Sequence, residues 1–292
     1  MKQFLIYTLV ITLSSTMASA KTSLWKVSKN NSSFYLGGTC HVLRTEDYPL
    51  PETFSKAYND SDQIIFEVDT SKFEDPKVME SMTNQMMYPT NALCKYFPSF
   101  CPTLEQDLNA TTIVLLKKYC KKNGVSFDNI KKMRPGFVST ILTIVELTKL
   151  GVTSGVDAHF LKRAMQDSKK MKFLETVDEQ LNLLFNMGKG NEDALITKSI
   201  LEAEDINANY EKMVNIWKEG DDMSSVFSEM QSQFPKLYKE LITDRDQKWV
   251  LPILESFHEI PDGQTTMVLV GAGHIDGLLK SFIKLDYKIE QL

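Results

Sequence analysis

The sequence predicts an α/β protein whose central mixed sheet is built from two related halves at the chain ends, flanked by helices, with a large helical middle region. Short apolar runs of strand length lie near both ends of the chain. A similar motif follows one run at each end, Gly38-Thr39-Cys40-His41 and Gly271-Ala272-Gly273-His274. The segment between them is dominated by helical periodicity. Open α/β sheets have this alternation of strands and helices.

The first half begins with a hairpin, because residues 24–27 and 33–36 flank a polar turn at Asn30-Asn31. A helix over residues 51–59 follows, and then the short buried strand Ile64-Ile65-Phe66. Glu67 therefore emerges at the carboxyl end of that strand.

The middle of the chain predicts mainly helices, because its apolar residues recur at helical spacing and its glycines and prolines lie at segment ends. A short strand at residues 172–174 ends at Glu175, and the next residues have capping-box spacing. The second half predicts a β-branched strand over residues 265–270. The predicted helices span residues 102–123, 135–150, 155–165, 192–218, 235–257 and 275–282, and a final strand covers residues 287–289.

The N-terminus has the pattern of a cleaved signal peptide over residues 1–20, with Lys2, an apolar stretch and Ala18-Ser19-Ala20. We expect a periplasmic or secreted protein after cleavage near Ala20. Residues 21–292 then form a single domain with a helical insertion at about residues 76–240.

The net charge of −5, with dispersed lysines, gives no electrostatic reason to expect a nucleic-acid partner. The apolar segment at residues 135–150 is too short to span a bilayer, so no stable membrane insertion is expected. The expected partner is a peptide or another small secreted substrate. In an oxidising compartment, Cys94 and Cys101 are the disulfide candidates among four cysteines.

Ligands of open α/β sheets bind outside the carboxyl ends of the strands. His41, Glu67, Glu175 and His274 all follow predicted strands at that end, so they can meet in one place. Two imidazoles and a carboxylate suit a divalent metal, and His41, Glu67 and His274 are the predicted ligands of manganese, cobalt or zinc. Without a metal, His41 or Glu67 can act as a general base.

Supporting residues lie around this set. Gly38, Gly271 and Gly273 allow a sharp turn or the close approach of a ligand. Arg245 offers a two-point fork to a carboxylate or an oxyanion, although a surface ion pair with Asp244 is the simpler interpretation. Asp157 is a further candidate, with stabilisation of a helix N-terminus as its alternative role.

Together these residues resemble the TraB/GumN family, which is related to the Tiki metalloproteases. The resemblance implies an α/β fold in which two halves each contribute a Gly-x-x-His motif to a shared cleft. It also implies that His41, Glu67, Arg245 and His274 are active-site residues. The family usually has asparagine after the arginine, whereas this chain has Asp246. The resemblance is carried by Leu24-Trp25-Lys26-Val27, Leu36-Gly37-Gly38-Thr39-Cys40-His41, Phe66-Glu67-Val68-Asp69, Gly155-Val156-Asp157, Leu174-Glu175-Thr176, Asp244-Arg245-Asp246 and Val270-Gly271-Ala272-Gly273-His274.

The sequence thus predicts an exported metal-dependent hydrolase, a peptidase, in which Arg245 steadies the substrate. Two alternatives stay open: a non-catalytic protein that binds a peptide or a metal-bearing ligand in the same place, and a metal-free esterase that uses histidine and glutamate.

Overall fold

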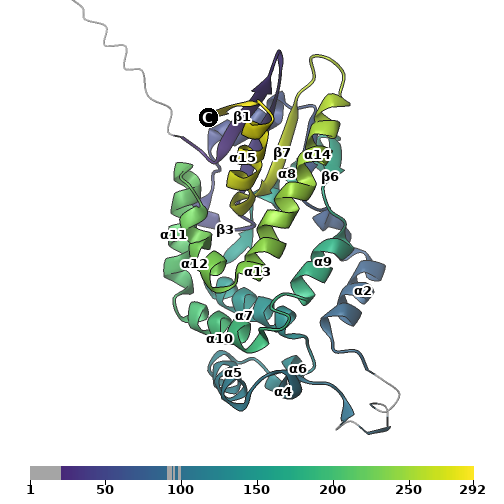
Figure 1. The fold of residues 1–292 in the computed structure, drawn as a ribbon, viewed down its shortest axis with the longest axis vertical. Helices are drawn as coiled ribbons and strands as arrows, with labels where there is room; N and C mark the ends of the chain where they lie inside the picture. Colours follow the sequence, from purple (N-terminus) through teal and green to yellow (C-terminus); the bar gives the residue numbers. More distant parts are fainter. Residues whose placement is uncertain (1–20, 91–93, 95, 98–99) are drawn as a thin grey trace, which may run out of the picture.

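A six-stranded mixed sheet forms one end of the molecule, and a group of helices forms the other (Figure 1). The computed structural model describes residues 21–90, 94, 96, 97 and 100–292. The predicted signal peptide lies outside the described residues. The strands of the main sheet run in the order β6-β4-β7-β2-β1-β8. Their bounds are β1 (Leu24–Lys29), β2 (Ser32–Thr39), β4 (Gln63–Phe66), β6 (Lys170–Phe173), β7 (Thr266–Gly271) and β8 (Lys288–Gln291).

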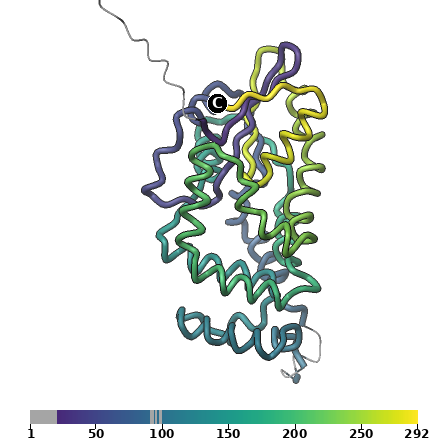
Figure 2. The backbone as a smooth tube through the Cα atoms, turned by 60° about the vertical axis from the view of Figure 1, so that its left-hand side comes forward, coloured from purple at the N-terminus to yellow at the C-terminus, as the bar shows by residue number. Residues whose placement is uncertain are grey.

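The two ends of the chain meet in this sheet, as Figure 2 shows. β2 pairs in parallel with β7, and β7 pairs in parallel with β4. β1 forms the predicted antiparallel hairpin with β2 and pairs with β8 on its other side. The four parallel strands β6, β4, β7 and β2 therefore present their carboxyl ends along one edge of the sheet.

Helices cover both faces of the sheet because its central strands are apolar on both sides. Met267 and Leu269 pack on the face covered by α1 (Glu52–Asp60), α8 (Val156–Gln166) and α11 (Ile206–Glu219). Val268 and Val270 point to the other face, which α14 (Asp244–His258) and α15 (Ile275–Lys284) cover.

The helical end has its own core, formed by residues such as Leu116, Val138, Leu142 and Ile196. The region predicted as a helical insertion also contains two strands: β6 joins the main sheet, and β5 (Val152–Ser154) pairs with β3 (Val42–Arg44). The remaining helices are α2 (Pro76–Met86), α4 (Leu104–Asp107), α5 (Ala110–Asn123), α6 (Phe127–Ile130), α7 (Pro135–Lys149), α9 (Val177–Phe185), α10 (Glu192–Glu204), α12 (Ser224–Gln233) and α13 (Pro235–Tyr238).

Two predicted helices are each divided in two. The segment 102–123 breaks because the side chain of Asn109 accepts a hydrogen bond from the Thr112 N–H and starts a new helix. The segment 192–218 breaks at Asp205, between α10 and α11.

Within the described part of the chain, no helix combines the length and the apolar character needed to cross a membrane. The structure does not show the expected disulfide between Cys94 and Cys101, which stays a prediction. A side-chain hydrogen bond between them is the largest cause that raises the pKa of Cys101.

Candidate functional site

The two Gly-x-x-His motifs lie side by side at the carboxyl edge of the sheet. Thr39 and Gly271 are register partners in the parallel pair of β2 and β7. Because the motifs follow these strands, His41 and His274 leave the same edge from neighbouring positions. The bipartite arrangement expected from the sequence is therefore present.

Two acidic residues follow the next parallel strands along this edge. Glu67 comes directly after β4, and Glu175 follows β6 after one residue. The backbone N–H of Glu175 donates to the carbonyl of Glu67 at 2.8 Å, which keeps the two strand ends together. Both side chains are only 5% exposed. Buried carboxylates need partners, because an unpaired charge away from water costs several kcal/mol.

The partner of both carboxylates is Arg245, whose five N–H groups all have acceptors. Its Nε and Nη2 donate to the two oxygens of Glu175 at 3.0 Å, and Nη2 also donates to Glu67 Oε2 at 2.9 Å. Its Nη1 donates to the Leu241 carbonyl at 3.0 Å and to His274 Nε2 at 2.9 Å. No N–H is therefore left for a substrate in this arrangement.

A π-helical turn, Lys239–Thr243, ends two residues before Arg245 and contains the Leu241 carbonyl that accepts its hydrogen bond. Such turns are frequent at functional sites. Burial lowers the pKa of Arg245, but the hydrogen bonds and charges of Glu175 and Glu67 outweigh it and raise that pKa. The surface alternative is not observed, because Asp244 pairs with Lys239 instead.

His274 is buried and neutral. Because Arg245 can only donate, Nε2 of His274 accepts, and the protonated Nδ1 donates to Asp246 Oδ1 at 2.7 Å. Burial lowers the pKa of His274 to about 4. Its ring packs on Trp249, with the ring centroids 4.5 Å apart. Asp246, which stands where the family usually has asparagine, is therefore the hydrogen-bond partner that orients the His274 ring.

Asp246 is itself buried, and burial raises its pKa to about 8. It lies against Gly277, where a Cβ would approach Oδ2 to 1.9 Å. The sequence named Asp246 only as a departure from the family pattern. Its contact with His274 depends on how α14 packs on α15, which has no local sequence signal.

His41 differs from His274 because its side chain is 62% exposed. Its Nδ1 bonds Asp157 Oδ2 at 2.9 Å, and Asp157 Oδ1 accepts the Thr39 hydroxyl at 2.6 Å. The charge of Asp157 is the largest cause that raises the pKa of His41 to about 9. Asp157 is thus a partner of His41 in addition to lying in the first turn of α8. Neither Thr39 nor this pairing was expected from the sequence.

His41 and Glu67 face each other across Gly271. A Cβ on Gly271 would lie 3.0 Å from His41 Nε2 and 3.2 Å from Glu67 Oε1. The Gly271 N–H donates to Glu67 Oε1 at 2.5 Å. Within the part of the chain that the structure describes, His41 Nε2 has no hydrogen-bond partner. An imidazole N–H and a carboxylate oxygen therefore flank one small space.

Gly38 and Gly273, the other two glycines predicted to support the site, lie in close contact with other parts of the protein. A Cβ on Gly38 would lie 2.6 Å from Ser23 Oγ and 2.8 Å from Ile275 Cγ1. A Cβ on Gly273 would lie 2.7 Å from the Phe227 ring. These two glycines permit close packing. Cys40 is buried, and burial raises its pKa to about 12, so its thiol is not an activated nucleophile.

The predicted ligands do not fit a divalent ion as they are arranged. His274 Nε2 and Glu67 Oε2 already accept hydrogen bonds from Arg245, and Glu67 Oε1 accepts one from the Gly271 N–H. A metal cation would have to displace the positively charged guanidinium of Arg245 from these ligand atoms. Among the described residues, no group of three or more His, Cys, Asp and Glu side chains is arranged to hold a metal. Metal ligation by His41, Glu67 and His274 stays a prediction.

The sequence model of the TraB/PrgY/gumN family matches residues 23–291. The chain is also 22% identical over 250 residues to the uncharacterized protein YbaP of Escherichia coli (strain K12), an alignment that covers 85% of each chain. No solved structure is significantly similar. The match spans every element that contributes to the His41, Glu67, Arg245 and His274 arrangement.

Proposed function

The chain belongs to the TraB/PrgY/gumN family, and from this premise we propose that it is a hydrolase that cleaves peptide bonds at the carboxyl edge of its sheet. The observation that carries the proposal is the pair formed by His41 Nε2 and Glu67 Oε1 across Gly271. A general base and a proton donor on opposite sides of one small space are what the hydrolysis of an amide requires.

Glu67 is the general base of the proposed reaction. Its carboxylate is held in one orientation by Arg245 and by the Gly271 N–H. Glu67 takes a proton from water as the water oxygen forms its bond to the carbonyl carbon. The electron pair of the carbonyl double bond moves to the carbonyl oxygen.

His41 is the electrophile and the general acid. Because Asp157 raises its pKa to about 9, His41 carries a proton at neutral pH. The imidazolium first donates a hydrogen bond to the oxyanion. It then gives its proton to the leaving amine as the C–N bond breaks. Each turnover ends with a net transfer of one proton from Glu67 back to His41.

Arg245, Glu175 and His274 position Glu67 in this proposal and do not contact the substrate. Their side chains are largely buried, whereas His41 is exposed, and both side-chain oxygens of Glu175 bind Arg245. This role differs from the substrate-binding role suggested by the sequence alone, because all N–H groups of Arg245 are already used.

The test is a peptide-library cleavage assay on residues 21–292, with and without excess chelator, beside elemental analysis of the same sample. Activity that survives chelation and falls at least about 100-fold in Glu67→Gln supports the proposal. The matched control is Glu179→Gln, which changes an exposed helix-capping glutamate. Activity that disappears on chelation and returns with manganese, cobalt or zinc favours the metal-dependent reaction instead. Peptide binding without turnover favours the non-catalytic alternative.

A further inference from the structure

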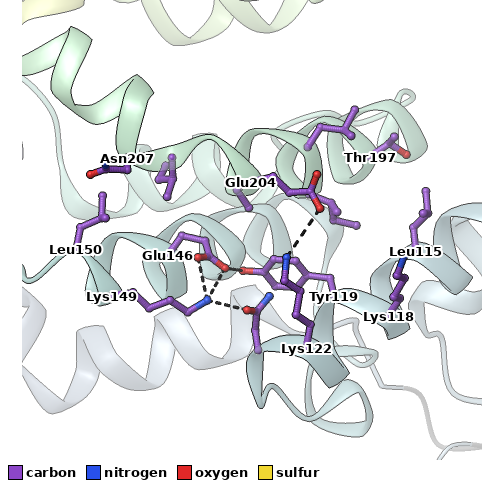
Figure 3. Close-up of a pocket in the computed structure, with 15 residues that line it drawn as sticks. Leu115, Lys118, Tyr119, Lys122, Glu146, Lys149, Leu150, Thr197, Glu204 and Asn207 are labelled. Carbon is purple, nitrogen blue, oxygen red and sulfur yellow. Dashed lines mark hydrogen bonds and ion pairs between the residues drawn. The ribbon is translucent and has the colours of Figure 1, made fainter.

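A cavity of about 580 Å³ lies in the helical end of the molecule, lined by residues of α5, α7, α10 and the start of α11. None of its lining residues belongs to the site at the sheet edge. The volume lies within the range of small-molecule sites. Figure 3 shows side chains from facing helices directed into it.

One part of the lining is a connected polar group. The Tyr119 hydroxyl donates a hydrogen bond to Glu146 Oε1 at 2.6 Å. Lys149 Nζ donates hydrogen bonds to the two oxygens of Glu146 at 2.8 and 2.9 Å (Figure 3). Lys149 also donates to Asn123 Oδ1 at 2.7 Å. The charge of the buried Glu146 carboxylate is thus balanced by Lys149, and both of its oxygens already accept hydrogen bonds.

The groups left over in this lining are donors. Asn123 Nδ2 is shielded from solvent and has no hydrogen-bond partner among the described residues. Among the residues that the structure describes, the single ion pair of Lys122 is a long contact of 4.0 Å with Glu204, and both of these side chains are exposed. Lys118 forms no ion pair within the described part of the chain. A shielded N–H without an acceptor is costly, so an oxygen acceptor is expected there.

The rest of the lining is apolar. Leu115, Leu150, Ile200, Leu201 and Ile206 contribute to it. Leu201 is 60% exposed and Leu115 is 36% exposed, although both are large hydrophobic residues. An apolar surface of this kind gains free energy when a hydrocarbon group covers it.

We propose that this cavity binds a small amphipathic carboxylate, an acid with an unbranched apolar tail. Its carboxylate oxygens accept from Asn123 Nδ2 and from Lys122, and its tail covers Leu201 and Leu115. A cationic ligand is disfavoured because Lys118, Lys122 and Lys149 outnumber the acidic residues of the lining, Glu146 and Glu204. This site is independent of the proposed hydrolase site.

The experiment is isothermal titration calorimetry of residues 21–292 with decanoate, and with 1-decanol as the uncharged probe of equal tail length. Decanoate is expected to bind with a Kd below about 100 μM, and 1-decanol at least about tenfold more weakly. This comparison uses the unmodified chain, so it does not depend on whether a variant folds.

Variants then locate the binding. Lys122→Met and Asn123→Leu are expected to weaken decanoate binding about fivefold or more. Lys121→Met is the matched control, because Lys121 neighbours Lys122 on α5 but does not line the cavity. The proposal is wrong if decanoate shows no saturable binding, if 1-decanol binds equally well, or if Lys121→Met weakens binding as much as Lys122→Met.

Discussion

Arg245 and Glu175 form a two-point ion pair, in which Nε and Nη2 of the guanidinium each lie 3.0 Å from one oxygen of the same carboxylate. Parallel hydrogen bonds of this kind fix orientation as well as charge. The same Nη2 bonds Glu67, so the position of Glu67 depends on a residue 178 positions along the chain.

Replacement of Arg245 by methionine is expected to lower the free energy of unfolding by about 3–5 kcal/mol, because it leaves two buried carboxylates without their partner. Urea denaturation followed by circular dichroism measures this. The control is Lys239→Met, which removes an exposed pair with Asp244 and is expected to cost less than about 1 kcal/mol. Equal costs for the two variants would contradict a structural role for Arg245.

Gly271→Ala is expected to reduce activity about 10-fold to 100-fold while leaving the thermal midpoint nearly unchanged. The added methyl would lie 3.0 Å from His41 Nε2 and 3.2 Å from Glu67 Oε1. The exposed His41 can swing away into solvent, so the fold tolerates the methyl although the pair is separated. Thermal denaturation and the peptide assay are measured on one sample. Full activity in a folded Gly271→Ala variant would show that the space between the two side chains is not used.

Asp246→Asn is expected to stabilise the protein, and increasingly so as the pH rises from 5 to 8. Burial raises the pKa of Asp246 to about 8, from its ordinary value of 3.8. Between these values the folded state binds more protons than the unfolded chain, so the contribution of Asp246 to stability falls with rising pH. Asparagine keeps an acceptor for His274 Nδ1 and does not ionise.

The pKa of His274 is lowered to about 4, so its own contribution rises with pH between about 4 and 6.5. Because Asp246 hydrogen-bonds His274, the substitution also changes the surroundings of His274, so the comparison between pH 7 and pH 8, above the range in which His274 titrates, isolates Asp246. Denaturation midpoints at pH 5, 6, 7 and 8 provide the measurement. A difference that stays constant from pH 5 to pH 8 would mean that Asp246 is ionised throughout.

Export is expected to leave a chain that begins at Lys21 and, in an oxidising compartment, to join Cys94 to Cys101. The two cysteines lie within one short segment, and an oxidising compartment favours a bond between them. Intact-mass measurement of the exported protein, before and after reduction, tests both points. A full-length mass would argue against signal cleavage, and an unchanged mass on reduction would argue against the disulfide.

Much of the site follows from the sequence because strand ends and motif positions have local signals. Glu67 follows a short apolar run, and His41 and His274 follow glycines at the ends of two others, so their shared edge is predictable from parallel pairing. The capping box at Thr176 and Glu179 was also predicted and is confirmed.

The contacts of Arg245 and Asp246 could not be predicted in the same way. They depend on the π-helical turn before Arg245 and on the packing of α14 against α15, and tertiary contacts decide both. The pairing of His41 with Asp157 joins a strand end to the first turn of a helix whose sequence also suits simple capping. The five hydrogen bonds of Arg245 also depend on tertiary contacts, so the sequence alone could not predict them.

The most direct test of the account is the pH dependence of kcat/KM in excess chelator, for the wild-type chain and for Asp157→Asn. The account predicts an alkaline limb near pH 9 in the wild type, because activity requires protonated His41 and Asp157 raises the His41 pKa to about 9. In Asp157→Asn this limb moves toward pH 6.5, the ordinary pKa of histidine. An alkaline limb that stays in place in Asp157→Asn would contradict the role assigned to His41.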